Sequence, residues 1–112
     1  MTNRYIVHQK AWDDVDVQER GEGAIWRSVV TGDTEIHRIE LRADARTDVP
    51  VQPGTWTIQV LEGRVTVLLM GNELMFDRER YAIIPPNVGF SIVAEGRRGA
   101  LVWLVHCRAG CS

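Results

Sequence analysis

The sequence has few cysteines and no apolar run long enough to cross a bilayer. Cys107 and Cys111 are its only cysteines, too few for a scaffold held by several disulfides. The longest apolar runs, VTVLLM and ALVWLV, are strand-sized, whereas a transmembrane helix needs about 20 apolar residues. The first residues, MTNRYIVHQKAWDD, show no apolar core of a signal peptide. We therefore expect a soluble cytoplasmic protein with no membrane partner.

An excess of positive charge is also missing. The formal net charge is −2 and the pI is about 5.9, and no basic stripe runs along the chain, which argues against a nucleic-acid partner. Hydrophobic residues make up 45% and charged residues 25% of the chain, as is ordinary for a globular protein. With 112 residues, a single domain spanning 1–112 is expected.

The two cysteines lie four positions apart in the tail HCRAGCS. Two reduced thiols are the simplest interpretation in the expected compartment. A disulfide would close only a small loop and stabilise little beyond it. A metal site made of His106, Cys107 and Cys111 is the third alternative, but no second pair at zinc-finger spacing accompanies these residues.

Alternation with a period of two is the strongest pattern in the chain, and it predicts half-buried strands. In EIHRIELRA, one face carries Glu35, His37, Ile39 and Leu41, and the other face is mostly charged, so His37 is expected to point toward the core. The segment TWTIQVLEGRVTVLLM continues the pattern, with Trp56, Ile58 and Val60 in one row and Val65, Val67 and Leu69 in the next.

Turn signals separate these strands. Gly71–Asn72 predicts a tight hairpin because both residue types tolerate positive φ. Two prolines end the short strand YAIIPP, and Glu95–Gly99 turns a last hairpin. Residues 10–20 hold at most a short helical turn. Many short strands at this spacing predict an all-β sandwich or barrel.

Two segments carry a family resemblance. VLEGRVTV, followed about twenty residues later by RYAIIPPNVGFSIV, resembles the cupin superfamily of RmlC-like jelly-roll β-barrels. The resemblance implies one cupin-like domain with its barrel core at about 24–106, an N-terminal strand or arm at 1–23 and a tail at 107–112. It also implies a homodimer and a pocket inside the mouth of the barrel.

The metal-binding motifs of that family are altered here. The resemblance places the four ligand positions at Pro50, Gln52, Trp56 and Phe90, anchored by Gly63 and by Asp44, which stands where the first motif begins with glycine. A longer spacing would put the first two positions at Val49 and Val51. In the second motif Pro85 matches, and Asn87 replaces the glycine two positions later.

None of these side chains is a usual ligand of a transition metal, which needs converging imidazole or carboxylate lone pairs. Proline and phenylalanine offer no lone pair, and tryptophan offers only an N–H donor. The resemblance therefore implies a metal-free cupin, and we expect no cofactor.

The aromatic replacements instead suggest a pocket walled by Trp56 and Phe90, with Gln52, Ile58, Ile92 and His106 also lining it. Such a pocket would bind a small organic molecule in a sensor or accessory role. In the alternative, the rings fill the mouth as ordinary core, and the barrel has a structural or dimerisation role.

An enzyme is the remaining hypothesis. His37 is the catalytic candidate, with His106 and Glu35 expected near the same mouth. These groups suit general acid–base catalysis of the isomerase or cyclase type, or a displaced metal site. Of these roles we favour small-molecule binding, and the sequence leaves open which ligand or substrate is bound and whether a reaction is catalysed.

Overall fold

Strands make up almost all of the regular structure. The computed structural model describes residues 11–108, and its one helical element in that range is the 3₁₀ turn η1, Trp12–Asp14. This confirms the predicted all-β class. No helix within residues 11–108 is long and apolar enough to cross a membrane.

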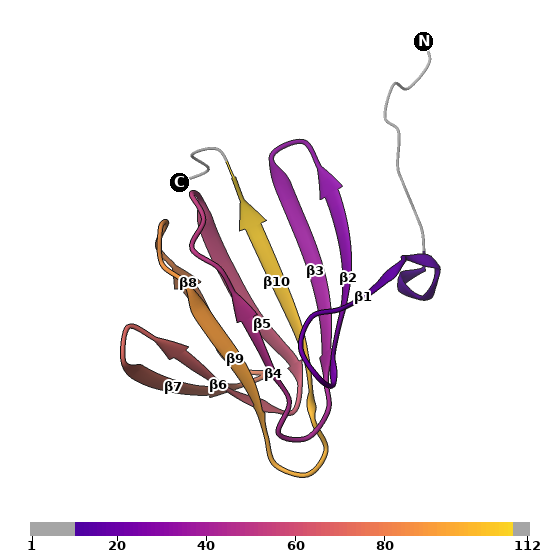
Figure 1. Cartoon of the computed structure of the whole chain (residues 1–112), viewed down its shortest axis with the longest axis vertical. Helices are drawn as coiled ribbons and strands as arrows, with labels where there is room; N and C mark the ends of the chain where they lie inside the picture. The colour runs from indigo at the N-terminus through magenta and orange to yellow at the C-terminus, as the bar shows by residue number, and fades with distance from the viewer. Residues whose placement is uncertain (1–10, 109–112) are drawn as a thin grey trace.

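Ten strands form two antiparallel sheets that face each other (Figure 1). The six-stranded sheet has the order β1-β2-β3-β10-β5-β8, with bounds Val17–Glu19, Ala24–Thr31, Thr34–Leu41, Ala100–Cys107, Thr55–Glu62 and Tyr81–Ile84. The four-stranded sheet has the order β4-β9-β6-β7, with bounds Arg46–Val49, Phe90–Glu95, Arg64–Leu69 and Asn72–Asp77. Non-consecutive neighbours such as β3 and β10 are the crossovers of a jelly roll.

The core lies between the two sheets and is built from the alternating positions that the sequence indicates. Ile39 and Leu41 of β3, and Ile58 and Val60 of β5, are all buried. Their counterparts in the second sheet include Val65 of β6. His37 shares the inward face of β3, as predicted, and is buried.

The hairpin between β6 and β7 turns one residue earlier than predicted. Leu69 pairs with Asn72, so the two-residue loop is Met70–Gly71 and not Gly71–Asn72. Both loop residues have positive φ, 51° and 78°, as a type I′ turn requires. Met70 adopts the left-handed region at the steric cost that any residue with a Cβ atom bears there, its side chain is exposed, and Asn72 begins β7.

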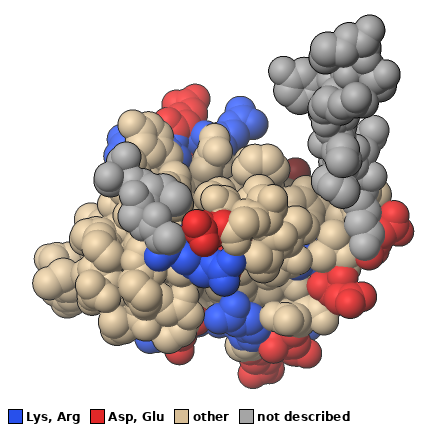
Figure 2. Space-filling view, turned by 90° about the horizontal axis from the view of Figure 1, so that it is seen from above, with Lys and Arg blue, Asp and Glu red and all other residues tan. Residues whose placement is uncertain are grey.

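The outer face of the six-stranded sheet carries exposed apolar side chains, namely Trp103 of β10 with Tyr81 and Ile83 of β8. The face seen from above in Figure 2 has acidic and basic side chains in small patches separated by uncharged surface. The homodimer stays a prediction, and the apolar outer face of the sheet is the part of the surface where it would be sought.

The turn between β9 and β10 contains two glycines of similar conformation in different surroundings. Gly96 and Gly99 have φ of 83° and 74°. A Cβ atom on Gly96 would meet nothing within 4 Å, whereas one on Gly99 would overlap the backbone carbonyl oxygen of Leu41. The Gly99 site therefore demands glycine for space as well as for its dihedral angles.

We expect Gly96→Ala to lower the free energy of unfolding by about 1–2 kcal/mol, the cost of a left-handed alanine. Gly99→Ala should cost about 3 kcal/mol or more, because the backbone of β3 must also move. Urea unfolding of the two variants checks this difference. Equal losses would show that the close approach to Leu41 is relaxed without cost.

Candidate functional site

The burial of β4 and of the segment after it does not match the motif spacing that puts the first two ligand positions at Pro50 and Gln52. Thr47 and Val49 of β4 are buried, and Pro50 is exposed. Gln52 is half-buried, and its backbone carbonyl accepts a hydrogen bond from the N–H of Asn87 at 2.9 Å. The inward-facing side chain is therefore Val49, which the longer spacing assigns to the first ligand position. Neither spacing supplies a metal ligand.

Two residues that replace motif glycines keep a backbone conformation that glycine favours. Asp44 has φ 61° and Asn87 has φ 65°. Aspartate and asparagine are the residues that adopt the left-handed region most readily after glycine. Both motif turns therefore keep their backbone shape, which supports the alignment on Asp44 and Asn87, although the ligands beyond them have changed.

Trp56 and Phe90 face each other across the two sheets, as expected from the sequence. Their ring centroids are 5.8 Å apart at an angle of 76°, an edge-to-face contact. Trp56 also stacks on His106, with centroids 4.0 Å apart and planes within 10°. The indole N–H of Trp56 is buried and has no hydrogen-bond partner within residues 11–108.

Sheet register explains why polar groups gather at this end of the sandwich. His106 pairs with Glu35 on one side and with Trp56 on the other, so these three residues form one row across β3, β10 and β5. His37 pairs with Ser28 of β2 in the next row. Paired residues of antiparallel strands point to the same face. Ser28, Glu35, His37 and His106 are called the histidine cluster below.

His37 lies between two indoles, and both of its ring nitrogens have partners. Its centroid is 5.1 Å from that of Trp26 and 5.8 Å from that of Trp56. Nδ1 is 2.6 Å from Ser28 Oγ, and Nε2 is 3.2 Å from Glu35 Oε1. A carboxylate only accepts, so neutral His37 donates from Nε2 and accepts the Ser28 hydroxyl at Nδ1. Ser28, His37 and Glu35 thus form one hydrogen-bonded chain.

His106 is held from both sides as well. Nε2 is 2.8 Å from the backbone oxygen of Pro53 and must carry a proton, because a carbonyl only accepts. Nδ1 is 3.4 Å from Glu35 Oε1, and Arg108 Nε lies 3.6 Å from the other Glu35 oxygen. Glu35 is therefore shared by two imidazoles and one guanidinium.

Burial decides the charge of His37. Desolvation lowers the pKa of His37, and the hydrogen bond and charge of Glu35 only partly oppose it. The positive charge of Arg20 lowers the pKa further, as does His106. His37 is accordingly a neutral base near pH 7, the form that can accept a proton.

Arg20 and Thr47 complete the site, and the sequence analysis missed both. The Trp26 indole donates to Thr47 Oγ1 at 2.9 Å, and the Thr47 hydroxyl donates to the Arg20 carbonyl at 2.7 Å. The guanidinium carbon of Arg20 lies 3.7 Å from the centre of the Trp26 ring. Thr47 shows inward alternation with Val49, which was a usable signal. Arg20 lies in a loop after a three-residue strand, so no periodic pattern fixes its direction.

Comparison with known proteins finds no matching family model and no matching curated protein. Solved structures do match. An RmlC-like cupin from Shewanella frigidimarina has a TM-score of 0.77 at 16% identity, covering 95% of both chains. The cupin domain of Cnp3 from Schizosaccharomyces pombe has a TM-score of 0.75 at 16% identity, covering 89% of this chain and 73% of that one.

This chain has the cupin jelly-roll fold. Some solved cupins with this architecture are described as enzymes. The polyketide cyclase RemF from Streptomyces resistomycificus has a TM-score of 0.74 at 16% identity, covering 90% of this chain and 79% of that one. A sugar phosphate isomerase from Silicibacter pomeroyi has a TM-score of 0.78 at 13% identity, covering 91% and 76%. Identities this low establish the shared fold alone.

The residues at the cupin motif positions do not fit a metal ion. Trp56 and Phe90 are in ring contact, and neither carries a lone pair suited to a metal. Within residues 11–108, no group of three or more histidines, cysteines or acidic residues is placed to hold a metal. His37 and His106 already direct both of their nitrogens at protein atoms. No step of a mechanism is therefore routed through a metal.

The tail residues do not build a site with the cluster. His106 is inward and almost fully buried, whereas the adjacent Cys107 belongs to the opposite face of β10, so they do not converge. Cys107 is disulfide-bonded, and the expectation of a reduced thiol at this position is wrong. Cys111 lies outside the described residues.

The remaining predicted pocket residues belong to the core or lie near the surface. Ile58 and Ile92 are fully buried, and Gln52 makes only the backbone contact given above. Four surface hollows of the described chain lie elsewhere, and Phe90 borders one of them. Ser28 borders another, of about 420 Å³, beside β1. The open pocket predicted around Trp56 stays a prediction.

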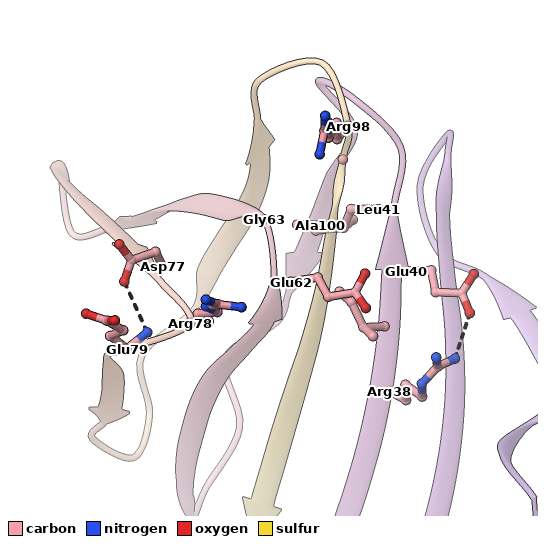
Figure 3. Close-up of a pocket in the computed structure, with 12 residues that line it drawn as sticks. Arg38, Glu40, Leu41, Glu62, Gly63, Asp77, Arg78, Glu79, Arg98 and Ala100 are labelled. Atoms are coloured by element: carbon pink, nitrogen blue, oxygen red, sulfur yellow. Dashed lines mark hydrogen bonds and ion pairs between the residues drawn. The ribbon is translucent and has the colours of Figure 1, made fainter.

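The most voluminous of these four hollows, about 920 Å³, lies at the opposite end of the six-stranded sheet (Figure 3). Its wall mixes both charges, with three arginines and four acidic residues: Arg38, Arg78, Arg98, Glu40, Glu62, Asp77 and Glu79. Arg38 donates to Glu40 at 2.7 Å. Charges that offset each other across an open surface make a weak binding site, so the histidine end remains the candidate.

The lowered pKa of His37 predicts a pH-dependent stability. The unfolded chain binds a proton here at about pH 6.5, but the folded chain resists it to lower pH. The stabilisation of the fold by neutral His37 is therefore complete above about pH 6.5, and it is lost as the pH falls toward the pKa of His37 in the folded chain. The thermal midpoint should drop by several degrees between about pH 7.5 and about pH 5.5, and less in His37→Gln. An identical drop in both proteins would contradict this assignment.

Proposed function

We propose that this cupin binds a small organic molecule beside Trp56 and the histidine cluster, without a metal ion. The buried, unpartnered indole N–H of Trp56 carries the proposal. Burying a donor without an acceptor costs about 1–3 kcal/mol. A bound carbonyl or carboxylate oxygen would remove that cost, so the site favours a ligand with an acceptor group.

The surroundings of Trp56 support a planar ligand with polar substituents. Two indoles, Trp26 and Trp56, flank His37, and aromatic walls favour flat or apolar groups. The Glu35 side chain is 20% exposed, and Ser28 borders a surface hollow. These two residues give the polar cluster its contact with solvent. A sensor or accessory role follows if binding is the whole activity.

The structural neighbours are compatible with this class of ligand. They include a polyketide cyclase and a sugar phosphate isomerase, which by those names act on organic molecules. The competing hypothesis is a filled sandwich with a structural role, and it draws on the direct contacts among Trp56, Phe90 and His106. A binding measurement separates the two.

Benzamide, a flat ring with a carbonyl acceptor, is a suitable neutral probe. Its addition at millimolar concentration should shift the indole N–H resonance of Trp56 downfield in a ¹⁵N–¹H spectrum. Trp56→Phe removes and thereby assigns that resonance and should abolish binding. Trp103→Phe, on the outer face of the sheet, should leave binding unchanged. If the Trp56 resonance stays fixed with benzamide and with related aromatic amides and acids, the filled sandwich is the better description.

A second candidate function is metal-free acid–base catalysis of the isomerase or cyclase type. The chain from Ser28 through His37 to Glu35 favours it, with contacts of 2.6 Å and 3.2 Å. Glu35 fixes the tautomer of His37, so the Nδ1 lone pair faces Ser28. A base oriented by a carboxylate in this way can take a proton from a carbon acid through the Ser28 hydroxyl.

Exchange of the methyl protons of pyruvate in heavy water tests this candidate, because exchange needs only a base and no full reaction. We expect the parent chain to accelerate exchange and Ser28→Ala to slow it at least about tenfold. Arg97→Gln, at the tip of the last hairpin, serves as the control and should match the parent. Equal exchange rates with Ser28→Ala and the parent would remove the acid–base proposal.

A further inference from the structure

Arg20 is a fixed cation that has no ion-pair partner among the residues that the structure describes. Its backbone is held by its own N–H donating to the Ala24 carbonyl at 2.9 Å and by the Thr47 hydroxyl on its carbonyl. Its guanidinium stacks on Trp26 at 3.7 Å. Among residues 11–108 no carboxylate lies within ion-pair distance of Arg20, since every such pair involves another cation.

The charges around the histidine cluster do not cancel. Glu35 is the acidic residue of the cluster, and it already contacts Arg108, His37 and His106. With His37 neutral, the two guanidiniums of Arg20 and Arg108 outnumber the single carboxylate of Glu35. Arg20 is also half-buried, and desolvation lowers its pKa despite the opposing charge of Glu35. An incoming anion stabilises a poorly hydrated cation more than it stabilises a cation that is exposed to water.

We propose that Arg20 binds the carboxylate of an organic anion whose planar body displaces side chains beside the buried indoles of Trp26 and Trp56. The inference rests on the proposed function and names its ligand class. A guanidinium presents two parallel N–H donors that match the two oxygens of a carboxylate. Stacking on Trp26 holds the guanidinium plane before the ligand arrives, so little rotamer entropy is lost on binding.

A carboxylate fits this arrangement better than a phosphate does. Among the fixed charges, Arg20 and Arg108 exceed Glu35 by one, and Arg20 is the one of the two that lacks an ion-pair partner within the described chain. A phosphate monoester carries up to two negative charges at neutral pH and would approach the Glu35 carboxylate with one of them unmatched. The buried Trp56 N–H adds a second donor that needs an acceptor oxygen.

Benzoate and benzamide form the test pair, because they share size and shape and differ by one negative charge. Calorimetric titration of the parent chain should show benzoate binding at least about tenfold more tightly than benzamide, which is about 1.4 kcal/mol. Arg20→Gln should erase this preference by weakening benzoate alone. Arg20→Lys should keep part of it, since lysine supplies the charge without the two-donor geometry. Arg97→Gln is the matched arginine control and should bind as the parent does.

The outcomes separate the two proposals. If both probes bind the parent equally and Arg20→Gln changes neither, the assignment to Arg20 is overturned while small-molecule binding stands. If neither probe binds the parent, the binding function fails and this inference fails with it. Retained benzamide binding by Arg20→Gln shows that the variant is folded, so a selective loss of benzoate supports the proposal.

Discussion

Two imidazoles buried between the sheets are the constraint on which this end of the molecule depends. An imidazole taken out of water must find partners for its nitrogens or lose several kcal/mol. His37 meets this demand with Ser28 and Glu35, and His106 meets it with Pro53 and Glu35. Each partner lies on a different strand or loop. The positions of β2, β3, β10 and the segment before β5 are therefore tied to one polar network.

Aromatic residues have replaced the coordination chemistry implied by the cupin resemblance, while the backbone around them is kept. Asp44 and Asn87 hold left-handed conformations where glycines are expected, so the turns of both motifs persist. Trp56 of β5 and Phe90 of β9 make an edge-to-face contact between the two sheets. The result is a site that holds an indole donor, a guanidinium and a neutral histidine whose lone pair is already engaged by the Ser28 hydroxyl, in place of converging metal ligands.

Most of the fold could be predicted from the sequence, because alternation by two fixes which side chains face inward. His37 and Trp56 were placed correctly for this reason, and the pairing of His106 with Glu35 follows once β3 and β10 are neighbours. The turn after β6 was wrong by one residue, since Met70 adopts a conformation that its type rarely favours. Arg20 could not be found, because its direction is set by stacking on Trp26, a contact between residues of different elements.

The stacking of Trp56 on His106 has an optical consequence. The two rings lie 4.0 Å apart and nearly parallel, a geometry that allows electron transfer from an excited indole to an imidazolium, and much less to a neutral imidazole. The emission of Trp56 is therefore sensitive to the charge on the ring stacked against it. The chain carries four tryptophans, so the emission of Trp56 is isolated as the difference between the parent and Trp56→Phe, without any attached dye.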